Sequence, residues 1–249
     1  MQFHEYGNPS APTVLLLHGG GLSDWSVRPA AKLLQKDYFV VTPVIDGHGE
    51  DWKQEFCSIE DSAQKVICYL QEHCGGRVFA IAGLSLGAQI AAQVLTDAPN
   101  AAQFAVLESA LVLPLPGLSS VETVYRLSAG LIQKKWFAHL QAKAMLLPAT
   151  LFEDYFRDSC RMTLPTLCHI AQSNGDFHIA PTFCETTAKV LVLAGQKERR
   201  IMLRSAALLH AAISGSRMMI LKDMHHGELS LRQPERYVAL LREFWQEKQ

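Results

Sequence analysis

Residues 77–95 read RVFAIAGLSLGAQIAAQVL, and this stretch decides the class of fold. Its first part, residues 77–82, is rich in β-branched and aromatic residues and predicts a strand. Residues 88–95 predict a helix that stops before Pro99. The segment between them, residues 83–87, follows the pattern G-x-S-x-G. This pattern is common by chance, but a strand directly before it and a helix directly after it are typical of a nucleophile elbow.

A serine at the apex of such a turn has a strained backbone, and its hydroxyl projects away from the sheet. Ser85 is therefore the candidate nucleophile. Gly83 and Gly87 fit this turn because side chains there would collide with the neighbouring strand and helix. The start of the helix also directs backbone N–H groups toward the reacting oxygen. The alternative is that Ser85 only caps the helix, with the glycines serving close packing.

Outside this stretch the chain alternates short apolar runs with amphipathic segments. Such alternation predicts an α/β fold with a mostly parallel central sheet and helices on both faces. The other predicted strands are residues 13–17, 38–42, 104–107, 189–193 and 218–221. The other predicted helices are residues 27–35, 58–70, 202–213 and 234–245.

The alternation breaks between residues 114 and 187, where the pattern turns helical and five prolines interrupt it. We expect residues 114–187 to form a helical cap, or lid, inserted into a core domain. The core domain would consist of residues 1–113 and 188–249.

Composition excludes several classes of protein. Apolar residues make up 49% of the 249 residues and charged residues 19%, which is typical of a packed globular protein. The net charge of −1, without a block of like charges, argues against a nucleic-acid partner or an anionic membrane surface. No apolar stretch approaches the roughly 20 residues that span a bilayer, and no signal segment is visible, so we expect a cytoplasmic location. The six cysteines have no C-x-x-C spacing, which argues against a metal or redox site.

Four landmarks occur in a characteristic order: HGGG at 18–21, DGHGE at 46–50, GLSLG at 83–87 and MHHGE at 224–228. In order and spacing they resemble the α/β-hydrolase superfamily, over most of the chain outside the predicted cap. The resemblance implies an α/β-hydrolase fold and a serine hydrolase that needs no cofactor and no metal.

The resemblance also implies a general-base histidine in the loop after the last strand, where His225 and His226 are adjacent. In related sequences the catalytic histidine usually precedes a small residue with an acid nearby. His226 precedes Gly227 and Glu228, so His226 is the predicted base and His225 the alternative. Imidazole titrates near neutral pH, which suits a group that takes the serine proton and returns it to a leaving group.

An acidic side chain must hold the other nitrogen of this base. The resemblance places the acid just after the penultimate strand, where a G-x-x-E pattern ends at Glu198. Glutamate departs from the commoner aspartate, and Glu108 and Asp223 stay open as alternative acids. The chain order Ser85, Glu198, His226 matches the nucleophile–acid–base order of the superfamily.

The oxyanion hole is expected to consist of the backbone N–H groups of Gly20 and Leu86. A glycine at position 20 lets the backbone approach a substrate carbonyl closely. His18 and His48 lie inside turn motifs of the family, so we expect both to be structural.

The expected reaction is hydrolysis of an ester-type bond in a small to medium, largely apolar substrate, through an acyl-enzyme on Ser85. Alternatives are a C–C bond hydrolase or lyase that uses the same three residues, and a non-catalytic receptor for a small ligand. The expected partner is a small-molecule substrate, and a homo-oligomer stays open. Candidate pocket residues in the cap are Tyr125, Leu131, Trp136, Phe137, Leu146, Phe152, Tyr155 and Phe156.

Overall fold

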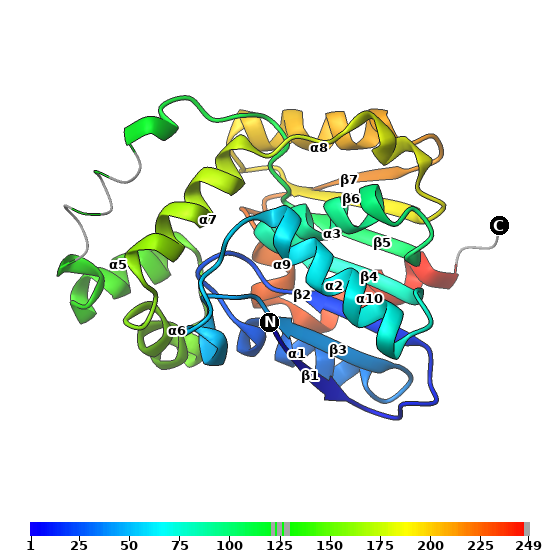
Figure 1. Cartoon of the computed structure of the whole chain (residues 1–249), viewed down its shortest axis with the longest axis horizontal. Coiled ribbons are helices and arrows are strands. Elements are labelled where there is room, and N and C mark those ends of the chain that lie inside the picture. The colour runs from blue at the N-terminus through cyan, green and yellow to red at the C-terminus, as the bar shows by residue number, and fades with distance from the viewer. Residues whose placement is uncertain (121–122, 124–125, 127–129, 247–249) are drawn as a thin grey trace.

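The computed structural model describes residues 1–120, 123, 126 and 130–246. Within these residues a seven-stranded sheet forms the centre of the molecule, in the order β1-β3-β2-β4-β5-β6-β7 (Figure 1). β1 is antiparallel to β3, and all other neighbouring strands are parallel. The strands are β1 (Gln2–Tyr6), β2 (Thr13–Leu17), β3 (Phe39–Val44), β4 (Val78–Leu84), β5 (Ala102–Glu108), β6 (Lys189–Gly195) and β7 (Arg217–Leu221). The mostly parallel sheet is the one that the sequence predicts.

The register of the central strands determines where their loops emerge. Leu84 at the end of β4 pairs with Glu108, and Glu108 at the end of β5 pairs with Leu193 in β6. The carboxyl ends of parallel strands therefore lie level, and the segments that follow them meet at one edge of the sheet. Ligands of open α/β sheets bind at this edge.

The sequence pattern does not predict β1. Its sequence QFHEY mixes polar and apolar residues, and every side chain in it is at least partly exposed. An antiparallel strand at the edge of a sheet needs no continuous apolar run. β1 therefore lacks the signal by which the buried strands are recognised.

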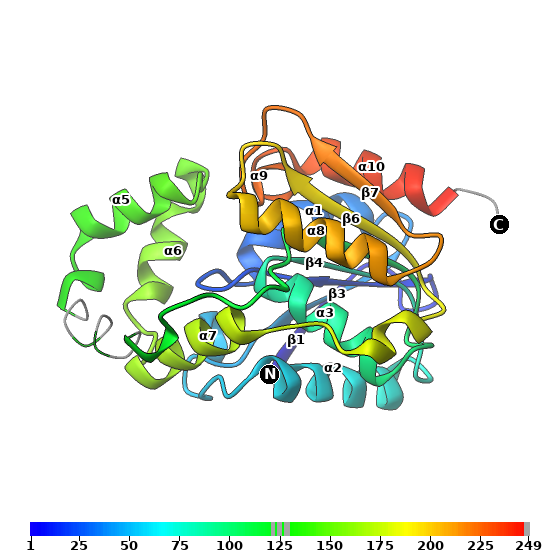
Figure 2. The ribbon, with the colours of Figure 1, turned by 90° about the horizontal axis from the view of Figure 1, so that it is seen from above.

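Helices cover both faces of the sheet. α2, α3 and α8 pack on one face, and α1, α9 and α10 pack on the other; Figure 2 shows α2 and α10 on opposite sides. Ser58 caps α2, since its hydroxyl accepts a hydrogen bond of 3.1 Å from Asp61 N. The helices are α1 (Asp24–Leu34), α2 (Ile59–His73), α3 (Leu86–Asp97), α8 (Arg200–Ala212), α9 (Glu228–Arg232) and α10 (Pro234–Gln246), with a short 3-10 helix η1 (Gly49–Asp51).

A helical segment lies between β5 and β6. Both views show α5 and α6 set off from the sheet, beyond its carboxyl edge (Figures 1 and 2). Trp25 of α1 packs with these helices, and its indole N–H donates to Asp158 over 2.8 Å. The described elements are η2 (Leu118–Ser120), α5 (Lys135–Ala144), η3 (Ala149–Leu151), α6 (Phe152–Ser159), α7 (Leu164–Asp176) and η4 (Pro181–Glu185).

α7 is attached to the core by three polar contacts with one loop. Thr166 Oγ1 accepts a hydrogen bond from Phe56 N over 3.4 Å, and His169 Nδ1 lies 2.9 Å from the oxygen of Phe56. Ser173 accepts a further bond from Ile59 N over 3.0 Å. α7 is thereby fixed directly to the segment that precedes and begins α2.

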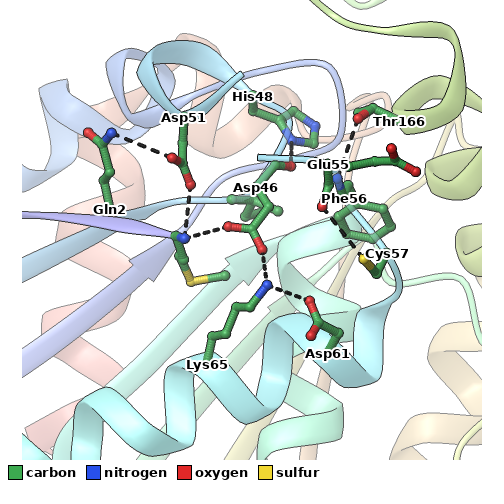
Figure 3. Close-up of polar contacts among 12 residues, drawn as sticks. Gln2, Asp46, His48, Asp51, Glu55, Phe56, Cys57, Asp61, Lys65 and Thr166 are labelled. Carbon is green, nitrogen blue, oxygen red and sulfur yellow. Dashed lines mark hydrogen bonds and ion pairs between the residues drawn. The ribbon is translucent and has the colours of Figure 1, made fainter. Parts of the chain in front are cut away.

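The DGHGE motif after β3 builds a buried ionic cluster. Asp46 accepts hydrogen bonds from Lys65 and from the Met1 ammonium, and Asp51 lies 2.9 Å from the same ammonium. Lys65 also reaches Asp61 over 2.7 Å (Figure 3). Burial opposes the charge on Asp46, but the hydrogen bonds from Lys65 and the ammonium lower its pKa. The motif therefore organises the loop after β3, and none of residues 46–50 lines a cavity that contains Ser85.

Candidate active site

Ser85 lies at a sharp turn between β4 and α3. Its φ of 52° and ψ of −113° are strained values for a residue with a side chain. The backbone N–H of Ser85 donates to the carbonyl of Glu108 over 2.8 Å, which ties the turn to β5. A Cβ atom at Gly83 would lie 2.3 Å from the oxygen of Gly87, and one at Gly87 would lie 2.5 Å from the oxygen of His18. Only glycine fits at either position.

The side chain of Ser85 makes no capping hydrogen bond with α3. The alternative interpretation of this residue as a helix cap therefore has no support in the geometry. Ser85 instead lines three neighbouring cavities at the carboxyl edge of the sheet.

Glu198 and His226 face each other across two loops. Glu198 Oε2 lies 2.9 Å from His226 Nδ1, so the imidazole N–H donates to the carboxylate. The Glu198 side chain is fully buried, whereas the His226 side chain is 46% exposed. Both residues line two of the cavities that contain Ser85. The structure thus brings together the three residues singled out as nucleophile, acid and base.

The other carboxylate oxygen of Glu198 is held by two donors. Gly195 N donates to Glu198 Oε1 over 2.6 Å, and the hydroxyl of Ser109 donates over 2.8 Å. Ser109 in turn accepts a bond of 3.2 Å from Gly227 N, next to His226. One hydroxyl therefore connects the acid loop with the histidine loop.

Sequence reasoning missed Ser109. It belongs to no motif, and its only signal is its place directly after β5, at the edge where the candidate residues gather. Its φ of 56° is unusual for a residue other than glycine.

The Glu198 carboxylate is held in its charged form. Burial alone would raise its pKa, but the hydrogen bond and charge of His226, with the donors Gly195 and Ser109, lower it. An anionic Glu198 orients the imidazole and stabilises the imidazolium when it forms.

Glu108, the first alternative acid, forms no hydrogen bond or ion pair with His226, whose partner is Glu198. Its side chain is buried, and Oε1 has one weak donor, Ser230 N at 3.5 Å. Oε2 has no hydrogen-bond partner among the described residues. Burial raises the pKa of Glu108 to about 7. Such a group is a poor counter-ion compared with Glu198.

The second alternative acid, Asp223, and the alternative base, His225, make other contacts. Asp223 is exposed and pairs loosely with Lys197 over 3.4 Å. The backbone N–H of His225 donates to Glu228 over 2.9 Å. The His225 side chain lines one cavity, while His226 holds the contact with Glu198.

Gly20 and Leu86, the expected oxyanion donors, lie close together. A Cβ atom at Gly20 would lie 3.5 Å from the Leu86 side chain. His18 fixes the start of this loop because Nδ1 donates to Gly19 O over 2.9 Å and Nε2 accepts from Ile45 N over 3.1 Å. Burial, with the neighbouring His48, lowers the pKa of His18 to about 3, so the ring stays neutral. Its contacts are those of a structural residue.

Three cavities surround Ser85. The large cavity, of about 500 Å³, extends under the helical segment and does not include His226. The histidine-side cavity, of about 310 Å³, includes Glu198 and His226. A third cavity, also of about 310 Å³, adjoins α8 and includes the same two residues.

The candidate pocket residues of the cap are only partly those that line these cavities. Tyr155 lines the large cavity and Leu146 the histidine-side cavity. Phe152 is buried among the helices, whereas Trp136 is 62% exposed. Tyr125 lies outside the described residues. Apolar cavity walls that the sequence did not single out are Leu115, Leu118, Ile132, Met145, Met162, Leu167 and Ile170.

Residues 14–240 match the model of the family described as Alpha/beta hydrolase family. The chain belongs to this family, and it is an enzyme with an α/β-hydrolase fold. No helix among the described residues is both long and apolar enough to cross a bilayer.

The sequence identity between this chain and similar known proteins is low. The chain is 27% identical over 101 residues to an AB hydrolase superfamily protein of Gibberella zeae, a match that covers 39% of this chain and 35% of the relative. The chain thus aligns with about a third of that relative's length. An enol-lactonase from Burkholderia xenovorans is 16% identical with a TM-score of 0.79, covering 99% of this chain and 96% of the other. A 2-hydroxy-6-oxo-6-phenylhexa-2,4-dienoate hydrolase from a Rhodococcus strain is 20% identical with a TM-score of 0.76, covering 97% and 92%. At these identities the likeness concerns the fold.

Proposed function

We propose that this enzyme is a serine hydrolase that cleaves an ester-type bond through an acyl-enzyme on Ser85. The observation that carries the proposal is the contact of 2.9 Å between Glu198 and His226, in cavities that Ser85 also lines. A nucleophile, a base and an acid that orients the base are the parts that acyl transfer requires.

In this mechanism the Ser85 oxygen attacks the carbonyl carbon, and its proton passes to Nε2 of His226. Glu198 holds the opposite ring nitrogen and stabilises the imidazolium. The N–H groups of Gly20 and Leu86 donate to the oxyanion, each contributing about 3 kcal/mol to lowering the barrier. His226 then returns the proton to the leaving oxygen, and the C–O bond breaks. Water, deprotonated by His226, attacks the acyl-enzyme and releases the acid and free Ser85.

The large cavity favours an apolar substrate part of small to medium size. Its walls are mainly Leu, Ile, Met and Pro side chains, and binding sites for small molecules are mostly apolar. We propose that residues 114–187 act as a cap over the core formed by residues 1–113 and 188–249. The cytoplasmic location and the homo-oligomer stay predictions.

A fluorophosphonate probe tests the nucleophile, because it forms a covalent bond with an activated serine. We expect the wild-type enzyme to be labelled and Ser85→Ala to remain unlabelled. Ser159→Ala is the matched control, since Ser159 lines the same large cavity and should leave labelling unchanged. Labelling that persists in Ser85→Ala would contradict the role of Ser85.

Hydrolysis of p-nitrophenyl esters of increasing acyl length tests the reaction and the size of the pocket. We expect turnover with an optimum at a small to medium acyl chain. Labelling of Ser85 without turnover of any ester would contradict the esterase proposal and would favour C–C cleavage or a lyase on the same three residues. If the wild-type enzyme were neither labelled by the probe nor active on any ester, a non-catalytic receptor for a small ligand would be favoured.

A further inference from the structure

The cavities around Ser85 differ in charge. Among its described lining residues the large cavity has no Lys, Arg, Asp, Glu or His. The histidine-side cavity contains Lys197, Arg199, His225 and the catalytic pair. Arg199 also lines the third cavity, beside Ile201 and Met202. Ser85 therefore lies at the boundary between a cavity without charged side chains and a cavity lined by the cationic side chains of Lys197 and Arg199.

The position of His226 determines how an ester would lie across this boundary. His226 must reach the leaving oxygen within hydrogen-bond distance, because it supplies the proton on bond cleavage. His226 lines the histidine-side and third cavities and not the large cavity. The alcohol part of the substrate consequently belongs on the side of Arg199, and the acyl part belongs in the large cavity.

The cations on the alcohol side are available to a ligand. Arg199 forms no ion pair within the described part of the chain, and Lys197 has only the loose contact of 3.4 Å with exposed Asp223. The one acid that lines this side, Glu198, is occupied by His226, Ser109 and Gly195. The cationic charge of Arg199 and Lys197 is thus not neutralised inside the cavity.

We propose that the leaving alcohol or phenol of the natural substrate carries an anionic oxygen group, a carboxylate or a phosphate, which Arg199 binds with help from Lys197. A guanidinium presents paired donors that match either group. This inference rests on the proposed esterase function and adds the chemical class of the leaving group.

Matched pairs of esters test the proposal. The butanoyl esters of 3-hydroxybenzoate and 3-hydroxybenzamide share the acyl group and differ in charge on the leaving side, and each rate is divided by its rate of alkaline hydrolysis. We expect kcat/KM to favour the anionic ester by roughly fivefold or more, and the preference to shrink at high salt, because both cations are exposed. An anionic acyl group, as in a succinate monoester of the same amide phenol, should bring no such gain.

Variants assign the effect to Arg199. Arg199→Gln should lose most of the preference while it still hydrolyses the neutral ester, and Arg199→Lys should restore part of it. Arg204→Gln is the matched control, because Arg204 lies exposed on α8, the helix that Arg199 precedes, and lines none of the three cavities. Equal losses in Arg199→Gln and Arg204→Gln would overturn the assignment.

Two further outcomes separate this proposal from the esterase function. Equal or faster hydrolysis of the neutral ester by the wild-type enzyme would overturn the anionic leaving group and leave the esterase function intact. Failure to hydrolyse either ester, or any p-nitrophenyl ester, would overturn both.

Discussion

Ser109 donates its hydroxyl hydrogen to Glu198 Oε1 over 2.8 Å, while the opposite oxygen of Glu198 faces His226. The acid is therefore held from both ends, and its carboxylate plane is fixed by Ser109, Gly195 and the imidazole together. This arrangement makes Ser109 a positioning residue in the proposed mechanism.

Ser109→Ala should lower kcat about tenfold with little change in KM, because a hydrogen bond to a charged group contributes about 1.5 kcal/mol or more. Loss of this donor also raises the pKa of Glu198, so the acid limb of the kcat/KM profile should move to higher pH. Ser205→Ala is the control, since Ser205 accepts a buried hydrogen bond from Val112 N and lines none of the three cavities. A similar change of pH profile in both variants would show that Ser109 acts only through stability.

Glu198→Gln should lower kcat by about four orders of magnitude, because the amide no longer stabilises the imidazolium or holds its tautomer. Glu108→Gln should retain most of the activity, since Glu108 forms no hydrogen bond or ion pair with His226. Steady-state rates on one ester compare the two variants, with circular dichroism to verify folding. The reverse ranking would make Glu108 the acid.

Glu108→Gln should also change how stability depends on pH. The folded-state pKa of about 7 exceeds the ordinary value of 4.5, so the folded protein retains a proton that the unfolded chain loses between these values. The contribution of Glu108 to wild-type stability therefore falls as pH rises from 4.5 to 7. Relative to wild type, the variant should gain up to about 3 kcal/mol between pH 4.5 and pH 8.

Urea unfolding at these two pH values measures this gain. Glu243→Gln is the control, because Glu243 is exposed. Its replacement should change the free energy of unfolding by the same amount at both pH values. The wild-type protein and Glu108→Gln could instead show the same difference in unfolding free energy between the two pH values. That result would assign the pH dependence to other groups.

Asp46→Asn should destabilise the fold by about 3 kcal/mol, because it leaves the buried Met1 ammonium and Lys65 without their shared carboxylate. Asp61→Asn removes an exposed partner of the same lysine and should cost less than about 1 kcal/mol. Chemical denaturation of both variants gives the comparison. Equal losses would mean that burial of Asp46 adds nothing to its ion pairs.

The alternating pattern of the sequence was sufficient to predict the parallel strands, because strands covered on both faces must be apolar throughout. The pattern also placed Ser85 between a strand and a helix, whereas Glu198 and His226 were predicted from the resemblance to the α/β-hydrolase superfamily, which places the acid and the base after the last two strands. β1 and Ser109 escaped prediction for a common reason. Their roles depend on partners distant in sequence, Val40 to Val44 for β1 and Glu198 for Ser109, and no local period encodes such partners.

The helical segment between β5 and β6 shows a second limit of prediction from sequence. Apolar side chains at helical spacing mark Trp136 and Phe152 equally as candidates, yet one is exposed and the other packs among helices. Which face of a helix in this segment turns toward Ser85 depends on how that helix packs against the rest of the protein. The sequence of a short helix does not contain that information.

Gly195 has a consequence that extends beyond its own loop. A Cβ atom there would overlap the carbonyl oxygens of Met224 and His225, and Lys197 N donates to Met224 O over 2.8 Å. The loop that carries Glu198 and the loop that carries His226 are thereby packed directly against each other at the end of β6. The walls of the large cavity, in contrast, come largely from residues 115–174. Changes within residues 115–174 can therefore alter which acyl part the enzyme accepts without disturbing Glu198 and His226, because the walls of the large cavity and these two residues belong to separate stretches of chain.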